Sequence, residues 1–583
     1  MPTLEWIGKS KVINHHQDVP FRVLERKYSF DENGQHNEDN GSENMIIRGD
    51  NLEALKALLP RYEGRVKCIY IDPPYNTGNE GWVYNDNVND PKIKKWLGEV
   101  VGKEGEDLTR HDKWLCMMYP RLKLLQKLLA DAGVIFISID DNELYNLKAI
   151  CDEIFGSNNF VANVIWQKTY SPRNDALGIP YETDNILVYS KTGRWFPNKL
   201  ERTAAMDERH DSPDNDPIPW QSGDVSAAGA ADHQGMVYAI QQPITGKLLY
   251  PASGRHWKDE QTVVLQRMNK WAKYELRNID DASVRAALCG ISIESVRQDV
   301  MAVMLAQPIE EATVQATARY EEGTWPEYYF TSKGKGGIRF KNHIKQDVGK
   351  SATNLWFYGD VGHTDEAKKE LKGIFSGVAP IETPKPRRLI ERILHIAADS
   401  NAIILDSFAG SGTTAHAVLN MNKADGGHRK FILVEMMDYA DSITAERVKR
   451  VIRGYGEGKN AVEGTGGNFS LYDLGEPLLH GDVLNENVGV EKIREYVYFT
   501  DTKASLPESH PDEPYFMGVH IGSAYYFYYE KQAVTTLNRE FLHTVKTEAD
   551  AYVIYADLCT LSEAELEKYH ITFKKIPRDI TKL

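Results

Sequence analysis

A carboxylate, two prolines and an aromatic ring follow one another directly after an apolar run. The run at 67–71 is typical of a buried strand, and Asp72-Pro73-Pro74-Tyr75 comes next. The prolines remove backbone donors and stiffen the turn. The turn would therefore present a carboxylate, a free carbonyl and one flat ring. This set suits a planar base that carries an exocyclic amine, although an ordinary turn has the same residue types.

A second turn of chemical interest lies more than 300 residues further on. Residues 402–405 are an apolar strand, and Asp406 to Thr414 (DSFAGSGTT) leads from it into a helical pattern. Glycines let the backbone approach a ligand closely, and a helix N-terminus offers unpaired N–H groups. Glu435 ends the next strand, where an acid can accept hydrogen bonds from the ribose of a nucleoside cofactor. Taken singly, each piece also fits an ordinary strand-to-helix turn.

Both turns need a sheet to hold them, and the chain around them alternates between strand and helix patterns. Predicted strands cover 44–50, 67–71, 133–139, 186–189, 402–405 and 431–435, and predicted helices cover 51–59, 114–129, 386–398 and 414–420. This alternation predicts a mostly parallel α/β sheet. Ligands bind at the carboxyl ends of such strands. We therefore expect the turns near Tyr75 and Phe408 to lie side by side at one edge of the same sheet.

Composition divides the chain further. The predicted segments are an N-terminal arm (1–43), the first half of the core (44–195), an insert rich in Pro, Asp, Gly and Trp (196–345), the second half of the core (346–453), a glycine-rich linker (454–467) and a small C-terminal α+β domain (468–583). The tryptophans of the insert are expected to be core residues more often than base contacts.

Charge is informative only locally. The net charge of −15 argues against attraction of phosphates over the whole surface. Between Thr331 and Lys350, however, six basic residues accompany one acidic residue: Lys333, Lys335, Arg339, Lys341, Lys345 and Lys350. A solvated loop would have the same composition.

Cysteine usage and hydropathy predict a cytoplasmic protein. The five cysteines form no CxxC pair, which favours neither a disulfide framework nor a zinc site. No apolar run approaches the ~20 residues of a membrane helix. The first residues carry no secretory pattern, and no metal is expected.

The two turns together resemble the amino-group DNA methyltransferases in the permuted (beta) order, in which the catalytic loop precedes the cofactor loop. Asp72 to Tyr75 matches their D-P-P-Y, and Phe408 to Gly412 matches their F-x-G-x-G. The resemblance is greater to modification (Mod) subunits of Type III restriction systems and their standalone relatives. It rests on 72–79 (DPPYNTGN), 114–122 (WLCMMYPRL), 139–143 (IDDNE) and 383–386 (TPKP), and it covers roughly 44–195 and 350–440.

The resemblance implies a methyltransferase fold of Rossmann type, S-adenosylmethionine as cofactor, and transfer to adenine N6 after base flipping. Its implied catalytic residues are Asp72, Pro73, Pro74 and Tyr75. Its implied cofactor residues are Asp50, Thr383, Lys385, Pro386, Asp406, Phe408, Gly410, Gly412, Thr413 and Glu435, with Asp50 near the cofactor adenine and Glu435 on the ribose. We expect the insert to recognise the target, with DNA contacts from Asn76, Lys333, Lys335, Arg339, Lys341 and Lys345. Expected partners are double-stranded DNA, a second copy of the chain and a restriction (Res) subunit.

Several alternatives stay open. Cytosine N4 methylation uses the same amine chemistry, as does methylation of RNA or of a protein amide. A catalytically inactive DNA-binding subunit would keep the fold. A nucleotide-hydrolysing motor is disfavoured, because Gly349-Lys350-Ser351 and Gly8-Lys9-Ser10 have Ile344 and Thr3 where a phosphate-binding loop needs its first glycine.

Overall fold

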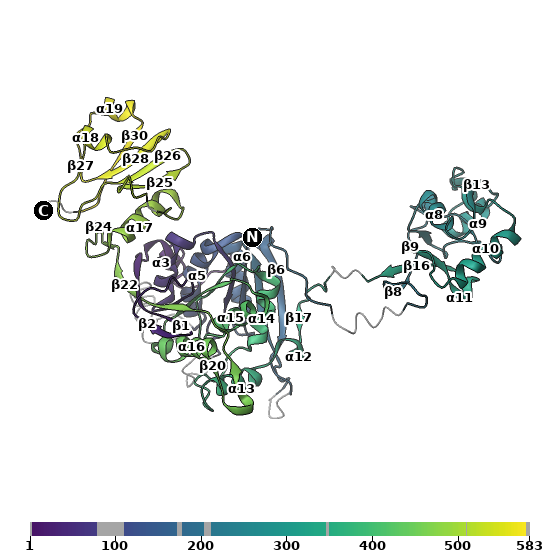
Figure 1. Cartoon of the computed structure of the whole chain (residues 1–583), viewed down its shortest axis with the longest axis horizontal. Coiled ribbons are helices and arrows are strands. Elements are labelled where there is room, and N and C mark those ends of the chain that lie inside the picture. The colour runs from purple at the N-terminus through teal and green to yellow at the C-terminus, as the bar shows by residue number, and fades with distance from the viewer. Residues whose placement is uncertain are drawn as a thin grey trace. The chain divides into compact units, whose positions relative to one another are not determined.

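The computed structural model of the chain describes residues 3–77, 110–171, 178–202, 212–344, 349–508 and 510–578. Its contacts divide the chain into two compact units (Figure 1). The main unit comprises Met1–Asn198 and Ala352–Leu583, and the insert unit comprises Lys199–Ser351. None of the helices in the described ranges is both long enough and apolar enough to cross a bilayer.

The main unit is built on one sheet of eleven strands. In spatial order they are β17 (Leu355–Trp356), β6 (Phe160–Gln167), β7 (Thr183–Ser190), β5 (Leu129–Ile139), β4 (Val66–Ile71), β18 (Ile403–Asp406), β19 (Lys430–Glu435), β3 (Met45–Arg48), β22 (Phe469–Pro477), β1 (Arg22–Asp31) and β2 (Gly34–His36). Six of the ten pairings are parallel, including every pairing from β5 to β22. The predicted mostly parallel α/β sheet is therefore confirmed.

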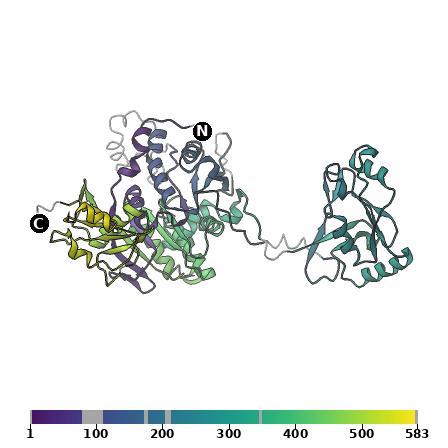
Figure 2. The same ribbon diagram turned by 90° about the horizontal axis from the view of Figure 1, so that it is seen from above.

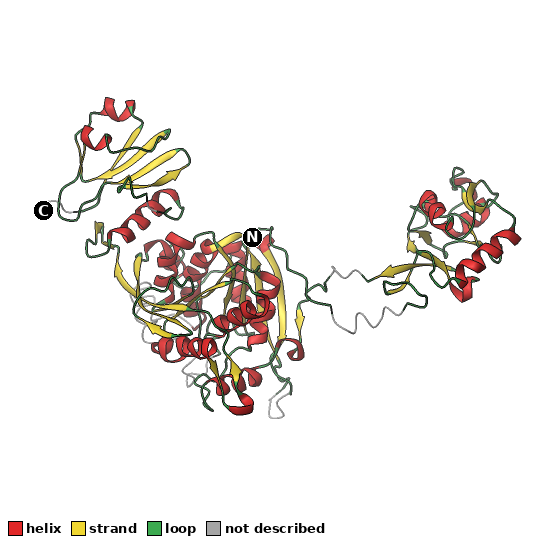
Figure 3. Ribbon diagram, in the orientation of Figure 1, coloured by secondary structure: helices red, strands yellow, loops and turns green. Residues whose placement is uncertain are grey.

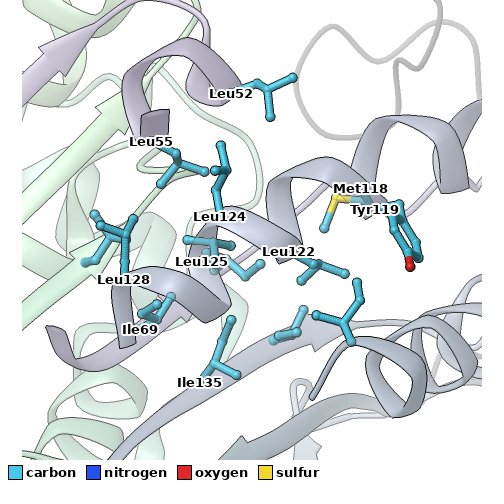
Figure 4. Packing of buried hydrophobic residues seen from close by; sticks show 14 of the residues in the cluster. Leu52, Leu55, Ile69, Met118, Tyr119, Leu122, Leu124, Leu125, Leu128 and Ile135 are labelled. Carbon is cyan, nitrogen blue, oxygen red and sulfur yellow. The ribbon is translucent and has the colours of Figure 1, made fainter. Parts of the chain in front are cut away.

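Helices pack on both faces of this sheet (Figure 3). One face is covered by α3 (Asn51–Tyr62), α5 (Arg110–Leu128) and α6 (Leu144–Phe155), whose apolar side chains pack on Ile69 and Ile135 of the central strands (Figure 4). Successive residues of a strand point to opposite faces. Tyr70 accordingly lies near the start of α15 (Thr413–Asp425), which packs with α14 (Arg387–Ala397). Each fully buried leucine of this core contributes about 1.5–3 kcal/mol.

The predicted N-terminal arm is wrong, because residues 22–31 form a strand of the main sheet. β1 pairs with β22 in antiparallel register, Phe30 opposite Phe469. The Phe30 side chain is 2% exposed. The segment earlier in the chain, with α1 (Lys9–Val12) and α2 (His15–Asp18), packs on α5. The polar stretch that suggested an arm is limited to the hairpin end and the loop that follows it.

Two boundaries near the C-terminal part also need correction. The predicted linker 454–467 forms a short hairpin, β20 (Gly454–Tyr455) with β21 (Val462–Glu463), after α16 (Glu446–Arg453). The predicted C-terminal domain begins too early, because β22 belongs to the main sheet. Beyond it, α17 (Val490–Thr502) and α19 (Glu563–Lys568) accompany a four-stranded sheet. Its strands are β25 (Phe516–His520), β26 (Ser523–Phe527), β28 (Ala551–Ala556) and β30 (Ile571–Lys575).

Within the described residues, the insert unit has its own core and three small sheets. Figure 2 shows the helices and strands of this unit. Its elements are β8 (Trp220–Gly223), β9 (Ser226–Ala228), β10 (Ile240–Gln241), β11 (Leu248–Leu249), β12 (Arg255–Trp257), α8 (Gln261–Met268), β13 (Tyr274–Arg277), α9 (Ala282–Cys289), β14 (Ala302–Leu305), α10 (Ile309–Glu321), β15 (Tyr328–Phe330), α11 (Thr331–Gly334) and β16 (Ile338–His343). Trp220, Trp257 and Trp271 are at most 5% exposed, so they are core residues, as expected. Leu200 and Lys350 exchange two backbone hydrogen bonds of 2.8 Å, so the two ends of the unit lie side by side.

A substitution in β1 tests whether the N-terminal segment is part of the fold. We expect Phe30→Ala to lower the free energy of unfolding by about 3–5 kcal/mol, because it removes a buried ring that packs on Phe469. Urea unfolding followed by fluorescence measures the change. Glu38→Ala, at an exposed position after β2, is the control. Equal stability of the two variants would contradict the placement of β1 in the core.

Candidate active site

The two predicted turns meet at one edge of the main sheet. β4 and β18 are parallel neighbours, with Cys68 opposite Ile404 and Ile69 opposite Leu405. Both strands therefore end at the same edge, where Asp72 follows β4 and Ser407 follows β18. The expectation that these turns lie side by side is confirmed.

A cavity opens between the two turns. Its lining comes from three segments: Tyr70 and Asp72 at the end of β4; Ile381, Thr383, Pro384 and Lys385 before α14; and Asp406, Phe408, Ala409, Gly410, Ser411, Thr413 and Thr414 from the end of β18 into α15. Of the predicted cofactor residues, Thr383, Lys385, Asp406, Phe408, Gly410 and Thr413 line it. We call this space the edge cavity.

Lys385 joins the two sides of the edge cavity. Its Nζ lies 2.6 Å from both carboxylate oxygens of Asp72 and 4.9 Å from the centre of the Tyr75 ring. Both side chains of the ion pair are largely buried, at 10% and 14% exposure. Burial raises the pKa of Asp72, and the neighbouring ammonium partly offsets that effect. The ion pair thus keeps an acceptor carboxylate at the mouth of the edge cavity.

The turn from Asp72 to Tyr75 is held in place by side chains that lie outside the motif. Trp114 of α5 donates its indole N–H to the Pro74 carbonyl at 2.7 Å. The Tyr75 hydroxyl lies 3.5 Å from Asp184, whose other oxygen accepts from Lys168 at 2.7 Å. The Tyr75 ring is half-buried. These contacts hold the turn in one conformation before any ligand arrives.

The glycine-rich turn is held by the carboxylates of Asp406 and Glu435 and by the Thr444 hydroxyl. Gly410 and Gly412 have φ of 53° and 79°, a left-handed conformation that favours glycine. The Gly410 N–H donates to Glu435 at 2.8 Å, and the Gly410 carbonyl accepts from Thr444 at 2.6 Å. Asp406 accepts the Phe408 N–H at 3.0 Å. Glu435 is therefore bonded to the turn, and its predicted ribose contact stays a prediction.

Arg447 of α16 is a site residue that the sequence did not reveal. Its guanidinium is 1% exposed and donates to the hydroxyls of Ser411 and Thr413 at 2.8 and 2.7 Å. Glu370 of α13 (Thr364–Ile374) lies 3.3 Å away and balances the charge. Arg447 thus fixes the start of α15. No sequence motif contains this arginine, so only the folded structure identifies it as a residue of the site.

A second buried arginine links the start of α3 to the glycine-rich turn. Arg121 of α5 donates to Asn51 and to Asp50, the latter at 3.3 Å, and Asn51 donates to the Ser407 carbonyl at 3.3 Å. Asp50 also caps α3 through the N–H groups of Leu52 and Glu53. Its predicted contact with a cofactor adenine stays a prediction. The predicted cofactor contact of Pro386, the residue before α14, also stays a prediction.

Two predicted DNA contacts are wrong. Lys341 is 1% exposed, and its Nζ lies 2.6 Å from both Asp214 and Asp216, so its charge is neutralised inside the insert unit. Asn76 is 3% exposed and donates to Glu143 and to the Arg110 carbonyl, which makes it a residue that shapes the turn.

The remaining predicted DNA contacts belong to the insert unit. Lys333, Lys335 and Arg339 are exposed there. Lys345 lies outside the described residues. Within the described ranges, no group of three or more His, Cys, Asp or Glu side chains is placed to hold a metal ion.

The buried carboxyls of the site give the main unit a testable pH dependence. Burial raises the pKa of Asp406 and of Glu435 to about 7 in each case, against the lowering effect of their hydrogen bonds. In the unfolded chain both carboxyls ionise near pH 4. Between pH 4 and 7 the folded state therefore holds more protons, and this contribution to stability is present at low pH and lost as pH rises through 7.

We therefore expect Asp406→Asn/Glu435→Gln to gain stability relative to the wild type as pH rises from 5 to 7. The relative gain should be roughly 1 kcal/mol per pH unit for each group. Urea unfolding at a series of pH values measures it. The exposed Asp399→Asn is the control and should follow the wild type. Parallel curves for the wild type and the double variant would contradict the raised pKa values.

Comparison with known proteins places this geometry in a family. A family model described as DNA methylase matches residues 66–446. The Type III restriction-modification enzyme StyLTI Mod subunit of Salmonella typhimurium is 31% identical over 444 residues, which are 71% of this chain and 58% of that protein. The EcoP15I Mod subunit of Escherichia coli is 29% identical over 475 residues, 78% of this chain and 66% of that protein.

The Type II methyltransferase M.KpnI of Klebsiella pneumoniae is 29% identical over 416 residues, 68% of this chain and 81% of that protein. The chain spans less than two thirds of the length of the two Mod subunits. The family model covers more than half of the chain, including both turns of the edge cavity. The resemblance to amino-group DNA methyltransferases is therefore confirmed, and the chain belongs to the DNA methylase family.

Proposed function

We propose that this chain transfers the methyl group of S-adenosylmethionine to the N6 amine of adenine in double-stranded DNA. One observation carries the proposal: the parallel pairing of β4 with β18 puts an amine-accepting turn and a glycine-rich turn on the same cavity. The family supports it, since the relatives are named methyltransferases and Mod subunits.

The glycine-rich side of the edge cavity fits a nucleoside cofactor. A Cβ added to Gly410 would meet only the Phe408 carbonyl, at 3.9 Å, so the space in front of this glycine is open. The start of α15 lies beside it and offers N–H groups. Phe408, Thr413 and Lys385 would complete the lining. When bound there, S-adenosylmethionine supplies a methyl carbon on a positively charged sulfur.

The other side of the edge cavity is built to hold an amine. Asp72 and the Pro73 carbonyl accept the two N–H bonds of the target, which aims the nitrogen lone pair into the cavity. In the described arrangement Lys385 contacts both Asp72 oxygens, so the arriving amine takes one oxygen and Lys385 keeps the other. The ammonium also favours the ionised form of Asp72, against the effect of burial. Positioning of this kind supplies most of the rate gain. Transfer would leave the cofactor sulfur as a neutral thioether, and the methylated nitrogen would release one proton to water.

An adenine inside a duplex cannot reach this edge, so the base must leave the stack at a cost of a few kcal/mol. Stacking on the Tyr75 ring would offset about 1–3 kcal/mol of that cost. The contacts of Trp114 and Asp184 fix the turn that carries this ring. In the amino-group DNA methyltransferases that this chain resembles, Asp at the first position of D-P-P-Y favours adenine N6 over cytosine N4 as the acceptor. Asp72 stands at that position here.

The biological setting is also part of the proposal. Similarity to Mod subunits supports a modification component of a restriction-modification system, with a Res subunit and a second copy of the chain as partners. The insert unit would recognise the sequence, with phosphate contacts from Lys333, Lys335 and Arg339. Modification-sensitive sequencing of DNA from cells that express the chain would report the base, its position and its sequence context.

Replacement of Asp72 tests the catalytic assignment. We expect Asp72→Ala to lower methyl transfer at least about 100-fold, because the amine loses its charged acceptor. Cofactor affinity should stay within a fewfold of the wild type. Transfer of tritiated methyl groups to DNA, RNA and protein substrates measures activity, and calorimetry measures cofactor binding. If the wild type methylates RNA or protein instead of DNA, the proposed substrate is wrong. If the product is N4-methylcytosine, the acceptor is cytosine N4 and not adenine N6.

Replacement of Gly410 tests the cofactor side. Gly410→Ala should abolish S-adenosylmethionine binding, because the new methyl group enters the open space before the turn and the left-handed backbone resists a side chain. Gly426→Ala is the matched control, since Gly426 has φ of 69°, no atom within 4 Å of its added Cβ, and a place at the far end of α15. Unchanged affinity in Gly410→Ala would refute this side of the site.

A further inference from the structure

Three aromatic rings lie together at the same edge of the main sheet as the edge cavity. Tyr170 follows β6, while Tyr358 begins α12 (Tyr358–Val361) and His363 precedes α13. The His363 ring contacts both tyrosines, with its centroid 5.2 Å from that of Tyr170 and 5.8 Å from that of Tyr358. Tyr170 is 60% exposed and Tyr358 is 38% exposed. We call this group the aromatic shelf.

The aromatic shelf is held in place by its backbone. The Thr364 N–H donates to the Lys168 carbonyl at 3.1 Å, which ties the end of β6 to the start of α13. The Gly362 N–H donates to the Tyr358 carbonyl at 2.8 Å. The Glu366 N–H donates to Nδ1 of His363 at 3.3 Å, so the central ring is fixed as the cap of α13. Exposed rings on a rigid frame lose little conformational entropy when a ligand covers them.

Contacts on two sides connect the aromatic shelf to the proposed catalytic residues. On one side, Lys168 reaches Asp184 at 2.7 Å, and Asp184 contacts Tyr75. On the other side, a Cβ added to Gly362 would lie 2.9 Å from Cβ of Pro386, the residue after Lys385.

Strand direction places the aromatic shelf at the same sheet edge as the edge cavity. β6 is parallel to β17 and, through antiparallel β7, runs in the same direction as β5 and β4, so Tyr170 emerges at the edge where Asp72 lies.

From these observations we propose that the aromatic shelf binds unpaired nucleotides of the target strand, those that leave the duplex beside the target base, by stacking of their bases on Tyr170 and Tyr358. The inference rests on the proposed function, which brings a flipped base to Tyr75. Acidic side chains stand close by, with Asp360 and Asp365 exposed, so phosphates are not the group that this surface attracts. Aromatic rings instead take any base through its flat face, without regard to sequence.

The test uses the full chain and a fluorescently labelled single-stranded DNA of mixed sequence as the probe. Tyr170→Ala/Tyr358→Ala should bind this DNA about tenfold more weakly than the wild type, with cofactor affinity unchanged. Tyr170→Phe/Tyr358→Phe should bind like the wild type, because stacking needs the rings and not the hydroxyls. Phe196→Ala is the control, since this ring is 79% exposed but lies beyond the opposite end of β7.

Each outcome decides the inference. Wild-type affinity in the Ala variant overturns it, as does an equal loss in the Phe variant, which would indicate a role for the hydroxyls. A changed oligomeric state in light scattering with unchanged DNA binding would assign the surface to a protein partner and overturn it as well. Methyl transfer by the wild type is measured in parallel. If the wild type transfers no methyl group but DNA binding still depends on the aromatic shelf, the proposed function is rejected and the stacking surface is retained.

Discussion

The parallel pairing of β4 with β18 is the contact on which the rest of this molecule depends. It joins segments more than 300 residues apart in the chain. Neither turn lines the edge cavity alone: one provides the Asp72 carboxylate, and the other provides open space before a helix start. A shift of one residue in this register would turn the side chains of one strand to the opposite face of the sheet. The large apolar core around Ile69 and Leu405 is what makes that shift costly.

Burial of charge is the second constraint at this edge. Burial disfavours the ionised form of Asp72, Asp406 and Glu435 and so raises their pKa values, and the charge of Asp72 adds to this effect at Asp406. The fold offsets the cost with backbone N–H groups, with hydroxyls and with the Lys385 ammonium. Arg447, on the far side of the same turn, is itself balanced by Glu370. The site is thus a balanced set of charges, in which loss of one partner leaves another buried and unpaired.

The sequence predicted what depends on local pattern. Strand and helix periodicity located the central sheet, and the residue types of the two turns located the edge cavity. Prediction from the sequence failed where the structure of a segment depends on a partner far away in the chain. β1 is a strand because it pairs with β22. Lys341 is buried because its charge is paired with Asp214 and Asp216, which lie more than 100 residues earlier in the chain. Arg447 and the aromatic shelf have no local pattern, since each gains its meaning from segments brought together only by folding.

The adjacency of Leu200 and Lys350 has a consequence for exchange of the insert unit. These two residues form an isolated bridge with two backbone hydrogen bonds, so the two ends of the unit stay together whatever lies between them. Replacement of the residues between them would therefore leave the points where the main unit's chain departs and returns unchanged. Under the proposed function, such a replacement would change the recognised DNA sequence without any change at the sheet edge.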